Sequence, residues 1–508
     1  MSRQELADEA NKYLHDNKQR TAMLSANYVG KLERGQFRWP DRDYREAFRE
    51  VLGASADRDL GFYIRRRGDD DPTAPANHVA WAGLHPTNFA RVAWIVAGQA
   101  TLPEAETQTA DAATSAALAP PSTQSLAGVD LSLSDSGDLL LVAPAGKFFS
   151  GTAIQLQVCP TKIRGQVFAE LGQGRAGDSF LAHPRRSLIS GLVVDDAGPQ
   201  LYAMDNRHAR HRMASADPHA KLGIPQAYAL DEITLGLLWA VTNLDEALLN
   251  DDRVLASSQE QLVTYEQLPR SAVSRDLANE LTPASTMWLG SHFCASHILR
   301  NLAATDDVPM FWTREQHGEE ASTWLLFTHK YEYLSRLSEQ FPTGMARTFC
   351  VPPSIVAASA QTERVLLILA AALMESFRIR VQVVQEPEYE SVDGFVLDGQ
   401  GRAIIANWVR ADGLWHVDVT SNRPAVRQYA DAAGHASTHS VLTAGTPGDR
   451  LHDLADYLGV DWSWLIGRCA ELADYGVSGI AEPRSRLLSV AGVDRACGLL
   501  GQLSGVRH

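Results

Sequence analysis

The sequence predicts a multidomain chain in which a small all-α head is followed by a β-rich unit and by an α+β body with a helical C-terminus. At about 100–200 residues per domain, a chain of 508 residues holds about two to four domains. Hydrophobic residues make up 45% and charged residues 21%, as in globular proteins. The hydrophobic spacing is helical before residue 53, alternates from about 128 to 205, and is helical again after 449.

Charge is distributed unevenly along the chain. The formal net charge is −15, from 46 basic and 61 acidic side chains. Residues 1–67 hold 14 of the basic and 11 of the acidic side chains, so the head is positive and the remainder strongly acidic. This asymmetry predicts one DNA-binding module attached to a body that does not bind DNA.

Cysteine usage and the early segments indicate a cytoplasmic protein without a membrane span. The five cysteines are odd in number and scattered, which argues against a disulfide framework or a zinc finger. The first 20 residues are charged and helical in pattern, unlike a signal peptide. The apolar stretch 79–100 is interrupted by polar residues, so it does not predict a transmembrane helix.

The head is expected to contain three helical segments. Residues 4–10 and 44–52 each show an amphipathic spacing. Between them, Ser25 is placed to cap a helix that stops at Gly35. With Val29 and Leu32 on the inner face of this helix, the side chains expected to point outward are Asn27, Tyr28, Lys31 and Arg34. Such a face suits the major groove, where Asn pairs with adenine and Lys reaches guanine.

The stretch LSANYVGKLERGQFRWP resembles the recognition helix and following turn of the Cro/repressor-type (XRE-like) helix-turn-helix family. The family pattern is S-x-x-Y-[IV]-x-x-L-E-[RN]-G. The resemblance covers about 50 residues and implies sequence-specific binding to double-stranded DNA, generally as a dimer on a palindromic site. It implies groove-facing roles for Ser25, Asn27, Tyr28 and Lys31, a backbone contact for Arg34, and structural roles for Glu33 and Gly35. Arg38, just beyond, is a further candidate DNA contact.

Two departures from the family concern the start of the head. Residues 11–23, with three basic side chains, take the place of the usual short turn between the paired helices. The first helix of the family is missing or merged into residues 2–17. The alternative for the whole head is a pair of amphipathic helices in a protein-interaction module.

The rest of the chain is expected to fall into three parts. Residues 68–127 read as a short helical segment, 79–98, and an Ala/Thr/Pro-rich linker, 99–125. Residues 128–284 read as a β-rich and then helical unit, with helices over 230–267. Residues 285–508 read as an α+β sensor or dimerisation domain, with a helix over 361–377 and four strands over 379–385, 394–397, 403–409 and 414–419. The apolar helices 230–255 and 361–377 are candidates for the dimer interface or the core.

Several local patterns are candidates for chemistry, and each has a structural alternative. The GxGxxG at 172–177 lacks room for a following helix before Pro184, which favours a glycine-rich loop over a dinucleotide site. Cys294 and His297 would share a helix face, as in a zinc or nucleophile site, but no fourth ligand is nearby. The basic cluster 207–212 could bind phosphate or be a solvated helix face.

The remaining patterns concern the body strands. His416 and Asp418 share one face of an expected strand, an arrangement that is common in proteins. Trp408 and Trp415 flank an expected hairpin turn and could line an apolar ligand cavity or pack in the core.

These observations favour a cytoplasmic, homodimeric transcriptional regulator, not an enzyme, with no cofactor or metal and with room for a small-molecule effector. The alternative is an enzyme or scaffold carrying a DNA-binding head, with chemistry around Cys294 and His297 or His416 and Asp418.

Overall fold

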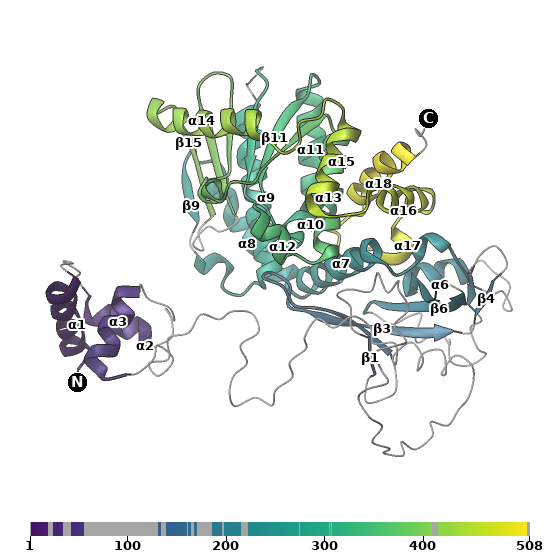
Figure 1. Cartoon of the computed structure of the whole chain (residues 1–508), viewed down its shortest axis with the longest axis horizontal. Helices are drawn as coiled ribbons and strands as arrows, with labels where there is room; N and C mark the ends of the chain where they lie inside the picture. The colour runs from purple at the N-terminus through teal and green to yellow at the C-terminus, as the bar shows by residue number, and fades with distance from the viewer. Residues whose placement is uncertain are drawn as a thin grey trace, which may run out of the picture. The chain divides into compact units, whose positions relative to one another are not determined.

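In the computed structural model, two compact units are distinguished, Met1–Ala80 and Trp81–His508 (Figure 1). The structure describes residues 2–18, 24–33, 42–54, 131–133, 139–159, 161–163, 167–169, 185–195, 198–214, 222–273, 275–303, 305, 307–408 and 415–504. The expected segment 79–98, the linker 99–125 and the glycine-rich stretch 172–177 lie outside these residues. No helix among the described residues is long and apolar enough to cross a membrane.

The described part of the first unit consists of three helices, α1 (Arg3–Lys18), α2 (Ala26–Glu33) and α3 (Arg42–Leu52). Their apolar faces meet in a small core, and its fully buried members are Ala7, Ala10, Leu14, Leu24, Val29, Ala47 and Phe48. The expectation that residues 11–23 form an insert in the turn is corrected, because α1 continues to Lys18. Buried Ala10 and Leu14, four residues apart, extend the apolar face of α1 through this stretch.

The middle of α1 is tied to the start of α2 by one side chain. The Asn11 amide donates to the carbonyl of Leu24 at 2.9 Å and accepts from its N–H at 2.8 Å. Ser25 then caps α2, its hydroxyl accepting from the N–H of Tyr28 at 3.3 Å. The entry to α2 is therefore fixed at two successive residues.

The first described part of the second unit is β-rich, as the alternating pattern predicts. A five-stranded sheet has the order β1-β2-β3-β6-β7, in which only the β3 and β6 pair is parallel. Its strands are β1 (Leu131–Leu133), β2 (Leu139–Ala143), β3 (Thr152–Cys159), β6 (Ser187–Asp195) and β7 (Gly198–Asp205). A three-stranded antiparallel sheet joins β4 (Thr161–Ile163), β5 (Val167–Ala169) and β8 (Leu222–Ile224). Helix α6 (Asn206–Ala214) follows β7 directly.

The body contains a seven-stranded mixed sheet with the order β12-β11-β10-β13-β14-β15-β9. Strands β10, β11 and β12 are parallel, β13, β14 and β15 continue as an antiparallel meander, and β9, from earlier in the chain, pairs antiparallel with β15. The bounds are β9 (Ser271–Val273), β10 (Met310–Thr313), β11 (Met345–Cys350), β12 (Ile379–Val384), β13 (Phe395–Leu397), β14 (Ala403–Asn407) and β15 (Trp415–Thr420). The four strands expected from 379 to 419 are all present.

Helices cover both faces of this sheet. Helix α14 (Arg423–His439) packs its alanine face on one side, against Trp312, Phe395 and neighbouring strand residues. The other side belongs to the main core, with the helices α7 (Glu232–Asn250), α8 (Asp252–Glu266), α9 (Pro283–Leu302), α10 (Gly318–Leu326), α11 (Thr328–Gln340), α12 (Pro353–Ala358) and α13 (Gln361–Ser376). The chain ends, as expected, in helices: α15 (Pro447–Leu458), α16 (Trp462–Tyr475), α17 (Ser478–Ala481) and α18 (Ala491–Ser504).

The apolar helices named as candidates for a dimer interface or the core are core helices. Most residues of α7 and α13 are buried within this chain. The two helices approach closely at Gly236, where a Cβ atom would lie 3.2 Å from the carbonyl oxygen of Thr362. Their apolar faces are thus largely occupied inside the second unit.

Candidate functional site

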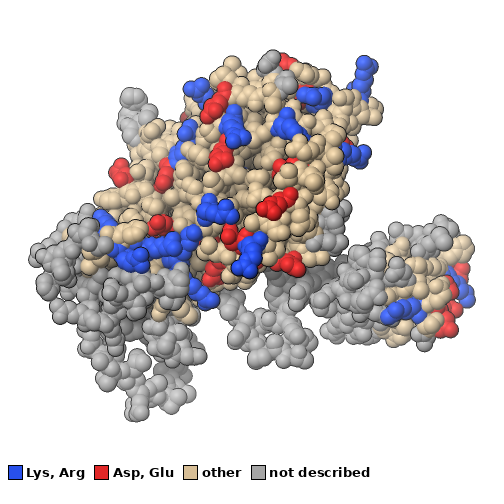
Figure 2. Space-filling model, turned by 180° about the vertical axis from the view of Figure 1, so that it is seen from behind, with Lys and Arg blue, Asp and Glu red and all other residues tan. Residues whose placement is uncertain are grey.

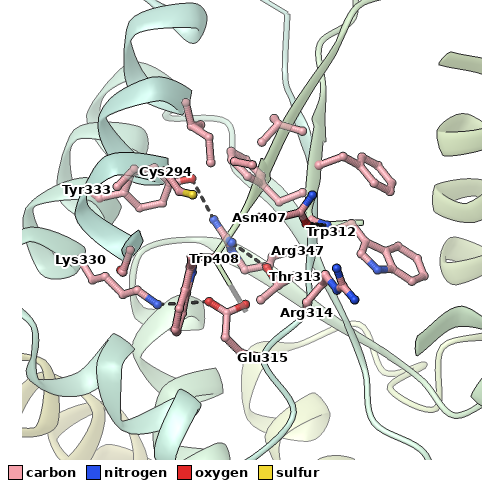
Figure 3. A pocket seen from close by; sticks show the side chains of 18 of the residues that line it. Cys294, Trp312, Thr313, Arg314, Glu315, Lys330, Tyr333, Arg347, Asn407 and Trp408 are labelled. Carbon is pink, nitrogen blue, oxygen red and sulfur yellow. Dashed lines mark hydrogen bonds and ion pairs between the residues drawn. The ribbon is translucent and has the colours of Figure 1, made fainter. Parts of the chain in front are cut away.

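A cavity of about 560 Å³, part of it open to solvent, lies between the seven-stranded sheet and helices α9, α10 and α11 (Figure 3). Its walls combine aromatic rings with charged and hydroxyl side chains, and they include Ser291, Cys294, Phe311, Thr313, Arg314, Glu315, Trp324, Lys330, Tyr333, Arg347, Asn407 and Trp408. These residues come from sequence positions more than 100 apart, brought together by the parallel pairing of β10 and β11 and the meander that follows.

Lys330 is a buried cation with a complete set of partners. Its Nζ lies 3.2 Å from Glu315 Oε1 and donates to Thr323 Oγ1 at 2.7 Å. The same nitrogen lies 3.8 Å from the ring centre of Trp324 and 4.8 Å from that of Trp408. Burial lowers the pKa of Lys330 to about 8, against the opposing effect of Glu315. The amine is therefore still mostly protonated at neutral pH.

Arg347 is the second buried cation, 4% exposed on β11. Its guanidinium donates to Thr313 Oγ1 at 2.8 Å and to the Tyr333 hydroxyl at 3.3 Å. It lies over the Phe311 ring at 4.5 Å and the Trp324 ring at 4.7 Å. Figure 3 shows Arg347 in the middle of the labelled side chains, with its bonds to Thr313 and Tyr333 dashed. Aromatic rings and cations thus alternate along this wall of the cavity.

Two potential nucleophiles reach the cavity from α9. Burial raises the pKa of the Cys294 thiol far above its ordinary value, which keeps the thiol protonated and unreactive. Ser291 Oγ lies 2.9 Å from His329 Nε2, a distance suited to a nucleophile and its base. However, burial and the neighbouring His292 lower the pKa of His329 well below 6.5, and His329 Nδ1 has no hydrogen-bond partner. Such a weak base binds a proton poorly, so acyl transfer by Ser291 and His329 is not favoured despite their short distance.

Cys294 and His297 do not share one site, and His297 lies instead beside the second pair, where Asp418 and His416 both affect its pKa. Cys294 lines the cavity, whereas His297 is bonded to Arg300 Nη2 at 3.1 Å and is 1% exposed. Burial lowers the pKa of His297 to about 4. His416 and Asp418 lie on β15 outside the cavity lining, with Asp418 3.6 Å from Arg270. Within the described part of the chain, no group of three His, Cys, Asp or Glu residues could hold a metal ion.

Of the two tryptophans proposed to line a cavity or the core, each takes one role. Trp408 lines the cavity. Trp415 is 7% exposed and packs on α9 at Gly290, where a Cβ atom would lie 2.5 Å from its indole nitrogen. Lys330, Glu315 and Arg347 were missed by sequence reasoning, since no spacing rule links them.

The head residues expected to contact DNA are described only in part. Ser25 is exposed and caps α2, while Tyr28 is half-buried with its ring 5.9 Å from that of Tyr44. The outward orientation expected of Tyr28 is thus modified, because its ring contributes to the core. Asn27 and Lys31 belong to α2, but their side chains, together with Arg34 and Arg38, lie outside the described residues.

The basic cluster 207–212 forms most of α6. Arg207, Arg210, His211 and Arg212 are exposed, as on a solvated helix face. Figure 2 shows Lys and Arg side chains gathered in the region of α6 and the five-stranded sheet. Arg212 also donates to the carbonyl of Gly223 at 3.1 Å, which gives it a local structural contact.

No protein-family model, no curated protein and no solved structure matches the chain.

Proposed function

We propose that the chain is a sequence-specific DNA-binding transcriptional regulator, acting in the cytoplasm as a homodimer. In this proposal residues 1–67 bind double-stranded DNA, and the acidic remainder serves as the effector or oligomerisation region. The observation that carries it is the stretch from Ser25 to Gly35, which combines a capped helix, the S-x-x-Y-V-x-x-L-E-R-G pattern and a locally positive charge.

The head offers support of a physical kind. Three helices share one core, and Asn11 and Ser25 fix the beginning of α2. A helix with a fixed entry can present the same side chains repeatedly to a base edge, which direct readout requires. Asn27 and Lys31 are the proposed base contacts, with Ser25 and Tyr28 beside them; Arg34 and Arg38 are proposed to contact the phosphate backbone.

The test is a selection of bound fragments from sheared genomic DNA with the full chain. The wild type is compared with Asn27→Ala/Lys31→Ala and with the control Gln4→Ala/Lys12→Ala, which removes one amide and one cation from exposed positions of α1. We expect a shared palindromic motif from the wild type and the control, and none from the Asn27/Lys31 variant. Recovery of the same motif from all three would overturn the assignment of these two residues.

Salt dependence separates the regulator from a scaffold that uses the head to bind protein. Neutralised phosphates give a log–log slope of about −0.9 per contact on duplex DNA. A flat salt dependence, together with no enriched fragment, would favour the scaffold.

A further inference from the structure

The charges around the cavity do not balance. Lys330 is paired with Glu315, and Arg314 on the rim is paired with Asp393 at 3.4 Å. For Arg347, no carboxylate within ion-pair distance is found anywhere in the described part of the chain. A guanidinium cannot lose its proton at neutral pH, so Arg347 is a buried positive charge with only neutral partners. Burial of such a charge is costly, and an anion that enters the cavity would relieve the cost.

The hydrogen bonds around Arg347 leave donors for such an anion. Thr313 and Tyr333 each use their oxygen to accept from the guanidinium, which leaves their hydroxyl hydrogens available. The Nε of Arg347 and the indole nitrogen of Trp324 are buried and have no hydrogen-bond partner. Four hydrogen-bond donors around Arg347 therefore lack an acceptor. One lies on each of β10, α10 and α11, and the fourth is the Nε of Arg347 itself on β11.

The side chains that line the cavity indicate what the uncharged part of the anion should be. The rings of Phe311, Trp324 and Trp408 line the cavity, and their contacts with Lys330 and Arg347 hold them in place. Ile298, Val396 and Ala406 add aliphatic lining. Planar apolar groups pack well on such walls, whereas a fully hydrated inorganic ion would leave the apolar lining in contact with water.

We propose that this cavity binds a small aromatic carboxylate, with Arg347 as the counter-ion of the carboxylate and the tryptophan rings as the walls for its ring. One uncompensated positive charge matches a monoanion, and a planar carboxylate matches the guanidinium fork. A role of this ligand as an effector rests on the proposed function above, but its binding is tested without DNA, so either proposal can fail alone.

The experiment is isothermal titration calorimetry of the full chain with a panel of aromatic carboxylates: benzoate, cinnamate and indole-3-acetate. Each is paired with its neutral amide, and inorganic phosphate is a further arm. We expect at least one carboxylate to bind in the millimolar range or tighter, and at least about tenfold better than its amide. Phosphate is expected to bind more weakly than that carboxylate.

Arginine variants test which side chain is the counter-ion of the carboxylate. Arg347→Met removes the unpaired cation, and Arg486→Met removes an exposed arginine outside the cavity that has an aspartate partner. We expect the first to lose at least about tenfold in carboxylate affinity and the second to stay within about threefold of the wild type. Arg347→Lys, which keeps the charge and loses the fork, is expected to be intermediate and provides a second reading should Arg347→Met fold poorly.

Any one of four results would overturn the proposal. The first three are amides that bind as well as carboxylates, a panel in which no carboxylate binds, and wild-type affinity in both Arg347 variants. Tighter binding of phosphate than of every carboxylate would also overturn it, because the site would then recognise a simple oxyanion.

Discussion

Removal of Lys330 should destabilise the second unit strongly, through the charge that it leaves behind. The side chains of Lys330 and Glu315 are 3% and 6% exposed and their atoms lie 3.2 Å apart. In Lys330→Met, the Glu315 carboxylate remains buried without its cation. Breaking a buried pair in this way costs about 3–5 kcal/mol of unfolding free energy. Two aromatic contacts of the ammonium, with Trp324 and Trp408, are lost as well.

The double variant Lys330→Met/Glu315→Gln removes both charges and should recover part of this loss. We expect the two substitutions to be non-additive by about 2–3 kcal/mol, as for residues in direct contact. The control cycle is Arg486→Met/Asp252→Asn, a pair with a similar distance, 3.3 Å, but 72% and 53% exposed side chains. Exposed pairs couple by about 1 kcal/mol at most, because water and salt screen them.

The assay is urea unfolding followed by tryptophan fluorescence. Trp39 is the only tryptophan in residues 1–80, so the signal reports mainly on residues 81–508. A loss below about 1 kcal/mol in Lys330→Met, or a coupling no larger than that of the surface pair, would refute the description of Lys330 and Glu315 as a buried pair.

Three further predictions concern other buried groups. The pKa of His297 is lowered from 6.5 to about 4, so between these pH values the unfolded state binds a proton that the folded state does not, and stability falls as the pH falls. In acid unfolding, His297→Asn should therefore lose about 3 kcal/mol less unfolding free energy than the wild type between pH 6.5 and 4. Glu319 accepts from the backbone N–H groups of residues 147–149, so Glu319→Ala should speed hydrogen exchange at these amides by at least about tenfold, and unchanged exchange would contradict the contact. Arg186 is bonded to two buried aspartates, so Arg186→Met should lose about 3–5 kcal/mol of unfolding free energy in urea. The exposed Arg210→Met should lose less than about 1 kcal/mol.

Long apolar elements could be predicted from the sequence. The helix expected over 361–377 is α13, and the alternating stretch of about 128 to 205 contains β3 and β6. In each, the apolar residues face a core that requires them, so the pattern and the fold agree. The helical C-terminus follows for the same reason.

Strand β11 shows why the cavity could not be predicted. Its sequence, MARTFC, places Arg347 and Thr348 side by side, and both are buried on opposite faces of the sheet. Polar residues on both faces erase the alternation that marks a strand. Arg347 is buried because Phe311, Trp324 and Tyr333 surround it, and these contacts arise from three other elements. A local pattern carries no information on such distant partners.

The head presents the opposite case. Its helix pattern, cap and charge are local, so they could be read from residues 4–53, apart from the extension of α1 to Lys18. What its outward side chains contact depends on a partner molecule, and for this the sequence offers a resemblance alone.

The central claim is sequence-specific DNA binding, and it is tested most directly by one comparison of affinities. The full chain is titrated, at one physiological salt concentration, with the most enriched genomic fragment and with a shuffled fragment of the same length and composition. Specific binding predicts an affinity ratio of at least about 10³. Equal affinities within a few-fold, at the same salt, would contradict the claim and leave only charge-driven binding.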